Sequence, residues 1–200
     1  MDNDNKRVLG LELPTDPRWV NLAEISLEEI LTDHAYCEQK ASTSCISLIQ
    51  KYPELELLVE SLAPIVTEEW GHFRSVLKEL KKRNLKLGKQ RKDEYVNALQ
   101  KFIRKGVSPE DLLLDRLVVC AMIEARSCER FRLLSLHIND DKLKTFYHQF
   151  MVAEAAHYKL FLELAAHYSN EEKARQRWKE CLLFEADVLA ALEIRGDRMH

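Results

Sequence analysis

The chain has 200 residues, of which 46% are apolar and 32% are charged, and its formal net charge is −3. This length suffices for one domain with its own core, and the slightly acidic balance argues against a general polyanion binder. Only five glycines and five prolines interrupt the chain, so long helices are expected. No apolar run reaches the roughly 18 residues that a membrane helix needs, and the first residues lack a signal-peptide core. We therefore expect a cytoplasmic protein that makes no membrane contact.

The cysteines are five in number and form no Cys-x-x-Cys pair. In a reducing compartment such residues act as small buried apolar side chains, and their spacing does not suit a structural zinc site. We expect free thiols at Cys37, Cys45, Cys120, Cys128 and Cys181.

Residues 1–25 are expected to form an extended lead-in, and residues 196–200 a frayed tail. Between them, helix-start residues and apolar stripes with helical spacing predict a series of helices. Their expected bounds are residues 26–52, 53–83, 93–105, 108–137, 140–168 and 170–195. Ser26 and Glu29 form a capping box at the start of the first helix, and Pro64 is expected to kink or split the second.

Two of the expected long helices carry a Glu-x-x-His motif on their apolar stripes. Glu69 and His72 form one motif, and Glu154 and His157 form the other. Residues three positions apart are neighbours on a helix face, so each pair can hold one metal ion from the same side. One such motif arises readily by chance in a chain rich in glutamate, so the motif alone is weak.

A second glutamate precedes each motif at nearly the same distance. Glu38 lies 31 residues before Glu69, and Glu124 lies 30 residues before Glu154. Each of these lone glutamates falls in the middle of an expected helix, on its apolar stripe. The chain therefore contains two helix pairs, and each pair supplies a Glu followed by a Glu-x-x-His.

This pattern matches the ligand set of di-iron carboxylate bundles, in which two helices each give a Glu and two others each give a Glu-x-x-His. Carboxylates can bridge two cations and nearly neutralise two ferrous ions, and imidazoles favour iron over magnesium or calcium. We expect an all-α, ferritin-like four-helix bundle with a crossover connection carrying a short extra helix and a fifth C-terminal helix. Residues 26–195 would form this single di-iron domain. The candidate iron ligands are Glu38, Glu69, His72, Glu124, Glu154 and His157.

The residues around these ligands resemble the MiaE family of tRNA-(2-methylthio-isopentenyladenosine) hydroxylases. The resemblance covers roughly residues 20–195 and is most specific around Glu124. It is carried by residues 31–42 (LTDHAYCEQKAS), 68–73 (EEWGHF), 123–131 (IEARSCERF), 154–158 (EAAHY) and the connector 88–97 (GKQRKDEYVN).

Membership of that family would imply an oxygen-dependent hydroxylation of the isopentenyl group on a hypermodified adenosine beside the tRNA anticodon. The same six glutamate and histidine residues would bind two iron ions, with O2 as co-substrate. The partners would be tRNA and an unidentified redox protein that supplies electrons.

Three further residues are candidates for the surroundings of the metals. His34 lies one turn before Glu38 and could hydrogen-bond it, or could be a satisfied core histidine. Tyr158 follows a ligand histidine and could wall an oxygen pocket, although core packing is the simpler interpretation. Arg126 could reach the outer surroundings of the metals, or could pair with acids at the surface.

A basic run lies between residues 78 and 92, where eight Lys or Arg residues are interrupted by one acid, Glu79. Such runs are usually solvated faces, but a tRNA substrate requires phosphate contacts. The candidate tRNA contacts are Lys82, Arg83, Lys89 and Arg91.

Two other functions remain open at this point. A different di-iron oxidoreductase, such as a ferritin-like peroxidase or an oxygenase of a small molecule, would use the same ligands. A rubredoxin-type CxxC…CxxC site, common in one such class, is absent from the sequence. A non-enzymatic iron-binding or storage bundle is the second alternative.

Overall fold

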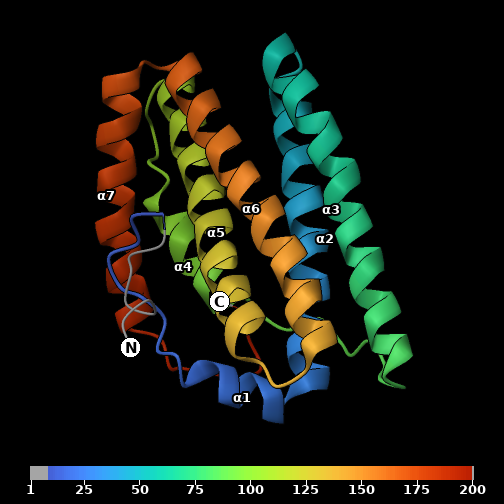
Figure 1. Ribbon diagram of the computed structural model, residues 1–200. Coiled ribbons are helices and arrows are strands. Elements are labelled where there is room, and N and C mark those ends of the chain that lie inside the picture. The colour runs from blue at the N-terminus through green and yellow to red at the C-terminus, as the bar shows by residue number, and fades with distance from the viewer. Residues whose placement is uncertain (1–8, 200) are drawn as a thin grey trace. The chain divides into compact units, whose positions relative to one another are not determined.

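The computed structural model describes residues 9–199, and within this range the chain is helical with no β-strand (Figure 1). The predicted all-α, ferritin-like class is confirmed, with helices at all six expected places and one more before them. The helices are α1 (Trp19–Ile25), α2 (Leu27–Lys51), α3 (Glu56–Lys82), α4 (Glu94–Leu99), the 3-10 turn η1 (Gln100–Phe102), α5 (Pro109–His137), α6 (Asp141–Tyr168) and α7 (Glu171–Ala190).

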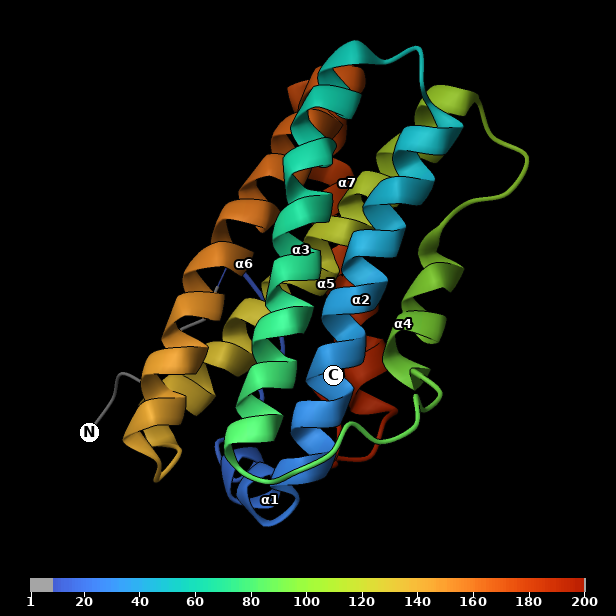
Figure 2. The ribbon, with the colours of Figure 1, turned by 90° about the vertical axis from the view of Figure 1, so that its right-hand side faces the viewer.

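The described residues form two compact units, each built on one antiparallel helix pair. The α2–α3 unit comprises residues 21–92 and 195–199, and α2 and α3 lie side by side in it (Figure 2). The α5–α6 unit comprises the described residues up to Val20 and residues 93–194, with α7 packed on α5 and α6 and α4 packed on α7 (Figure 1). That residues 26–195 act as a single domain stays a prediction.

Side chains cap several helices where the sequence predicted a start. The oxygen atoms of Asp93, Ser108 and Asn170 accept hydrogen bonds from backbone N–H groups three residues on, at 2.9, 3.1 and 2.9 Å. Asp140 accepts from the next turn in the same way. Each cap satisfies a backbone donor that the first helical turn leaves without an intrahelical partner, which is why these helices begin where they do.

The predicted capping box at Ser26 does not form. Ser26 precedes α2, but its side chain makes no capping hydrogen bond, and its φ and ψ of −113° and 39° lie outside the usual capping conformation. Ser26 directly follows the last residue of α1, so the chain passes from one helix into the next without the extended residue that a side-chain cap requires.

Helix α3 runs unbroken through Pro64, so of the two predicted outcomes the split is wrong, and the kink stays a prediction. Pro64 is exposed, while Leu62 and Ile65 on either side of it are buried. The backbone carbonyl that loses its helical partner can therefore be hydrated, and burial of the apolar face holds the two halves of the helix together.

The expected extended lead-in contains a helix, α1, in its last seven residues. Asp16 accepts a hydrogen bond from the backbone N–H of Arg18 at 2.9 Å, and its carbonyl accepts from Trp19 at 2.9 Å. Asp followed by proline is a helix-start signal, since the acid caps the first turn and Pro17 has the φ of a helix. The expectation of an extended segment is therefore wrong for residues 19–25. Residues 1–8 of the lead-in lie outside the described part.

The end of the chain is anchored rather than frayed as far as Met199, so that expectation needs correction. The backbone N–H of Met199 donates to Asp33 at 2.8 Å, and Asp197 accepts from Arg91 at 2.8 Å. Gly196 allows this path, because a Cβ atom there would lie 2.3 Å from the backbone of Leu22. The last residue of the predicted tail, residue 200, lies outside the described part.

None of the helices within residues 9–199 combines the length and the apolar character that crossing a membrane would require.

A buried carboxylate ties three segments of the α5–α6 unit together. Asp115 of α5 is fully buried and accepts from Arg104, which follows η1, at 2.8 to 2.9 Å. It also accepts from Arg177 of α7 at 2.6 Å. Burial raises the pKa of this carboxyl. The hydrogen bonds from Arg104 and Arg177 lower the pKa by more than burial raises it, so the pKa lies below its ordinary value.

We predict that Asp115→Asn lowers the free energy of unfolding by about 2 kcal/mol at pH 7, because it breaks a largely buried ion pair. The folded pKa is depressed, so this contribution is present above the pKa of an unfolded aspartate and is lost as the pH falls through the folded value. Urea unfolding between pH 7 and pH 3 should show the gap between wild type and variant narrowing below about pH 4.

The control for this prediction is Glu163→Gln, which removes an exposed carboxylate paired with Lys159 at 3.6 Å. Exposed pairs contribute little, so this variant should match wild type within about 0.5 kcal/mol at every pH. If the difference in free energy of unfolding between wild type and Asp115→Asn stayed constant with pH, the ionised Asp115 would not be the source of the lost stability.

Candidate metal centre

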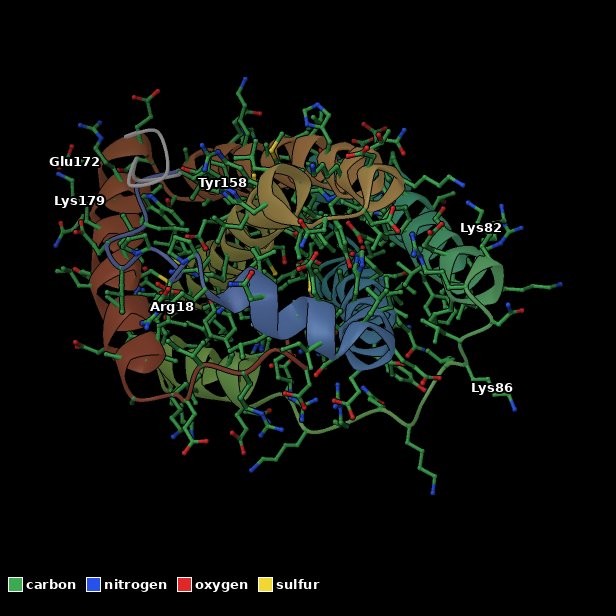
Figure 3. The ribbon with its side chains drawn as sticks, turned by 60° about the horizontal axis from the view of Figure 1, so that its bottom comes forward. Arg18, Lys82, Lys86, Tyr158, Glu172 and Lys179 are labelled. Carbon is green, nitrogen blue, oxygen red and sulfur yellow. The ribbon has the colours of Figure 1, made fainter. Side chains whose placement is uncertain are left out.

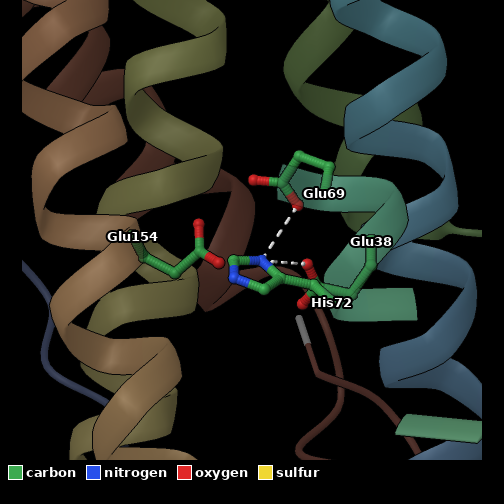
Figure 4. Close-up of side chains that lie close together, drawn as sticks. All are labelled: Glu38, Glu69, His72 and Glu154. Atoms are coloured by element: carbon green, nitrogen blue, oxygen red, sulfur yellow. Dashed lines mark ion pairs between the residues drawn. The ribbon is translucent and has the colours of Figure 1, made fainter. Parts of the chain in front are cut away.

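The α2–α3 unit brings together three of the predicted ligands. Glu38 of α2 is 3% exposed and Glu69 of α3 is fully buried. The Nδ1 atom of His72 lies 3.3 Å from Oε2 of Glu38 and 3.5 Å from Oε2 of Glu69 (Figure 4). One ligand atom from each of the three side chains lies within 4.8 Å of the others.

These side chains meet because each occupies a position on the side of its helix that faces the core. In α3 the buried residues Leu62, Ile65 and Val76 flank Glu69 on the same face, with the helical spacing expected of a core stripe. His72 lies one turn after Glu69, so the two side chains extend from the same side of the helix. The predicted pairing of Glu69 with His72 therefore follows directly from helix geometry.

The α5–α6 unit holds a second group of the same composition. Glu124 of α5 is 6% exposed, and Glu154 and His157 of α6 are each 2% exposed. The Nδ1 atom of His157 lies 3.7 Å from Oε2 of Glu154. The ligand atoms of these three residues also lie within 4.8 Å of one another.

The spacing within each group suits a bound cation. Metal–nitrogen and metal–oxygen bonds of about 2.0 to 2.2 Å place two ligand atoms on the same ion about 3 to 3.5 Å apart. The three imidazole–carboxylate distances of 3.3, 3.5 and 3.7 Å are close to this range. Buried carboxylates are costly unless a positive charge compensates them, and a divalent cation would do so in each group. The donors of each unit therefore fit a metal ion.

Among the described residues, neither group of potential metal ligands includes a cysteine. Burial, with a further contribution from Glu124, raises the pKa of Cys120 to about 12. Burial, with Glu154 next in effect, also raises the pKa of Cys128 to about 12. Both cysteines are therefore neutral thiols at physiological pH in the metal-free protein. The donors are carboxylate oxygens and imidazole nitrogens. This set suits iron, whereas structural zinc sites commonly use thiolates.

Of the residues predicted to surround the metals, His34 contacts a ligand candidate. Its Nε2 atom lies 2.7 Å from Oε1 of Glu38, and both side chains are buried. Tyr158 instead packs against Trp178 of α7, with ring centroids 5.4 Å apart, which is the packing role that the sequence left as the alternative. Burial raises the pKa of the Tyr158 hydroxyl, so it stays protonated.

Arg126 is directed into a buried ionic cluster and not to the surface. Its side chain is fully buried and pairs with Glu129 at 2.8 Å and with Glu185 of α7 at 2.8 Å. It also donates to the backbone carbonyl of Leu13 at 2.9 Å. Two residues along a helix are separated by about 200°, so Arg126 faces away from Glu124.

The same cluster includes residues that sequence reasoning missed. The hydroxyl group of Tyr95 donates to Glu185 at 3.0 Å, and Thr15 donates to Glu129 at 2.6 and 2.7 Å. Burial raises the pKa of Glu185 despite the opposing effect of Arg126. These residues lie far apart in the chain and share no sequence spacing, so no local signal could have grouped them.

The predicted tRNA contacts divide into two kinds. Lys82 and Arg83 both pair with Glu79, at 3.1 and 2.9 Å, and Arg91 pairs with Asp197. Lys89 is exposed, and Lys82 keeps 71% of its side chain exposed despite its pairing. Arg83 and Arg91 are therefore largely occupied with contacts inside the α2–α3 unit.

The connector that follows α3 is fixed along the first turns of α2. The backbone N–H groups of Lys86 and Gly88 donate to Glu28 at 2.9 Å and to Thr32 at 3.2 Å. The hydroxyl group of Tyr36 donates to the carbonyl of Gly88 at 3.0 Å. The backbone is thus anchored while lysine side chains remain exposed, and Lys82 and Lys86 point away from the helices in Figure 3.

Two helix pairs, each with a Glu and a Glu-x-x-His close enough together to hold a metal ion, define a ferritin-like protein. Residues 4–200 match the family model described as tRNA-(MS[2]IO[6]A)-hydroxylase (MiaE). The chain belongs to the MiaE family.

Two relatives bear the name tRNA 2-(methylsulfanyl)-N(6)-isopentenyladenosine(37) hydroxylase. The protein of Pseudomonas putida (strain KT2440) is 38% identical over 161 residues, covering 80% of this chain and 77% of the relative. The protein of Salmonella typhimurium (strain LT2) is 29% identical over 219 aligned positions, covering 84% and 80%.

A solved structure, described as "Protein 43 with aldehyde deformylating oxygenase activity from Synechococcus", shares the fold with a TM-score of 0.89. The two sequences are 34% identical, and the match covers 95% of this chain and 94% of the solved chain.

Proposed function

We propose that this protein is a di-iron, O2-dependent monooxygenase that hydroxylates the isopentenyl side chain of a hypermodified adenosine next to the tRNA anticodon. The observation that carries the proposal is the repeated group of a Glu and a Glu-x-x-His, buried in each unit of a MiaE-family chain. The hydroxylase name of the two relatives supplies the substrate class. The ligands would be Glu38, Glu69, His72, Glu124, Glu154 and His157.

The chain's own residues perform the supporting chemistry. Four carboxylates offset the charge of two ferrous ions, and the two imidazoles complete a donor set of mixed hardness. When bound, the iron pair supplies the oxidising power to place one atom of O2 on a C–H bond, while the other atom leaves as water with two protons and two external electrons. Burial of the four glutamates and of His157 limits the access of bulk water to the site, while His72 keeps 17% of its side chain exposed.

The reaction itself is the first test. Reduced, iron-loaded protein with isopentenylated tRNA under 18O2 should yield nucleosides with one labelled hydroxyl group on the isopentenyl chain, detected by mass spectrometry. The free nucleoside should react at least tenfold more slowly, because phosphate contacts remote from the base help to position it.

The competing functions give different products in the same experiment. Aldehyde deformylation, the activity for which the solved relative is named, would consume an aldehyde added to the assay. Peroxide turnover with unchanged tRNA would indicate a peroxidase, and iron uptake without either product would indicate storage. Any of these with unlabelled tRNA would refute the hydroxylase proposal.

The ligand set generates a second prediction. Wild type should bind about two ferrous ions per chain under anaerobic conditions, as the six-residue pattern requires. Glu124→Ala and His157→Ala should each retain less than about half of that iron and remain helical, measured by colorimetric iron analysis and circular dichroism. His148→Ala, which alters an exposed histidine of α6, is the matched control. Full iron content in both ligand variants would refute the assignment.

A third prediction concerns RNA binding by the connector. The exposed lysines Lys86, Lys89 and Lys92 can reach phosphates without first breaking an ion pair, unlike Arg83 and Arg91. Changing all three to Ala should weaken binding of the tRNA and lower the slope of log Kd against log salt by about two to three. Iron content should not change.

The control for the connector removes the same charge from exposed lysines elsewhere, namely Lys101, Lys105 and Lys179. If both triple variants lose equal affinity and equal slope, the connector has no special role. Arg91→Ala should act differently, because it releases Asp197 and the carbonyl of Glu29, and should lower the melting temperature.

A further inference from the structure

We infer that His34 is a positioning residue that holds Glu38 as a one-oxygen ligand, and that the two metal positions are consequently inequivalent. The inference rests on the proposed di-iron function. It goes beyond that function because it assigns different behaviour to the two halves of the ligand set.

The two oxygen atoms of Glu38 have different partners. Oε1 lies 2.7 Å from Nε2 of His34, and Oε2 lies 3.3 Å from Nδ1 of His72. An ionised carboxylate only accepts hydrogen bonds, so the imidazole donates its Nε2 proton. One oxygen is therefore held by the protein, and the other is directed at the remaining donors of the unit.

The length and burial of this hydrogen bond make it a firm constraint. The His34 side chain is fully buried and that of Glu38 is 4% exposed, so water does not compete for the pair. Hydrogen bonds to a charged acceptor are short and roughly twice as strong as neutral ones. The hydrogen bond occupies one lone pair of Oε1 and fixes the plane of the carboxylate, so it favours metal binding through Oε2.

The turn of α2 that carries His34 is itself anchored. Asp33, the preceding residue, accepts from the backbone N–H of Met199 at 2.8 Å and from Arg198 at 3.4 Å. His34 and Glu38 are also one turn apart on the same helix, so their backbone separation is constant. The donor thus has a fixed position from which to orient the carboxylate.

The α5–α6 unit differs at the corresponding place. Four residues before Glu124 stands Cys120, whereas four residues before Glu38 stands His34. A thiol is a weak hydrogen-bond donor, and an imidazole N–H is a strong one. The two units therefore differ in the donor type one turn before the lone glutamate, so the two metal positions have different surroundings.

The test compares His34→Gln with His34→Asn in the full-length protein. The glutamine amide reaches about as far as Nε2 and can replace the donor, whereas the asparagine amide is too short to reach Oε1 of Glu38. Anaerobic titration with Fe(II) should show two binding events in wild type. His34→Asn should weaken one of them 10- to 100-fold. His34→Gln should stay within about threefold of wild type for both, as should the matched control Cys120→Ala.

Two further measurements separate positioning from folding. The melting temperature of the metal-free proteins, followed by circular dichroism, should fall by similar amounts in the two His34 variants. A loss of iron affinity in His34→Asn alone then reflects the position of Glu38 and not a loss of folding. Mössbauer spectra of wild type loaded with 57Fe(II) should show two quadrupole doublets of equal area, since the two irons have different surroundings.

Equal iron affinities in His34→Asn and wild type would overturn the inference, as would an equal loss in His34→Gln and His34→Asn. A single Mössbauer doublet would overturn it even if the variants did not fold. Wild type that binds no Fe(II) would instead refute the proposed di-iron function, so the two failures are distinguishable.

Discussion

The burial of carboxylates on apolar helix faces is the constraint on which the rest of this structure depends. Glu38, Glu69, Glu124 and Glu154 each occupy a core-facing position that leucine could fill, at a large cost in desolvation. Other buried acids in the chain have arginines beside them, as Asp115 and Glu185 do. Glu38, Glu69 and Glu154 lie beside histidines instead, and a ligand atom of Glu124 lies within 4.8 Å of one of His157, which suits an environment completed by metal cations.

The contrast between these two kinds of buried acid explains how the chain divides its polar residues. The ionic cluster around Arg126 joins α5, α7, the segment before α1 and Tyr95 of α4, and its acids accept hydrogen bonds from protein donors. It therefore stabilises the α5–α6 unit without a ligand. The Glu and His groups do the reverse, since they reduce stability unless a cation is present. Structural and chemical roles are thus separated between opposite faces of the same helix, α5.

Much of this organisation was predictable from local signals. The helix starts at Ser108 and Asp140 and the two Glu-x-x-His pairs depend on spacing along one helix, which the sequence records directly. What could not be predicted depends on contacts between distant segments. The pairing of Arg126 with Glu185, the burial of Met199 and the anchoring of Asp33 arise only when the chain folds, and no periodicity marks them. The short helix α1 is a different case, because Asp16 and Pro17 before it are a local helix-start signal.

The position of residues 195–199 also bears on how the protein is made. Although nearly all of the α2–α3 unit comes from residues 21–92, its last contacts are supplied by residues that follow α7. During translation the α2–α3 hairpin therefore emerges long before the segment that binds Asp33 and Arg91, with more than 100 residues synthesised in between. At typical elongation rates of about 5 to 20 residues per second, the hairpin waits several seconds or longer for its own completion.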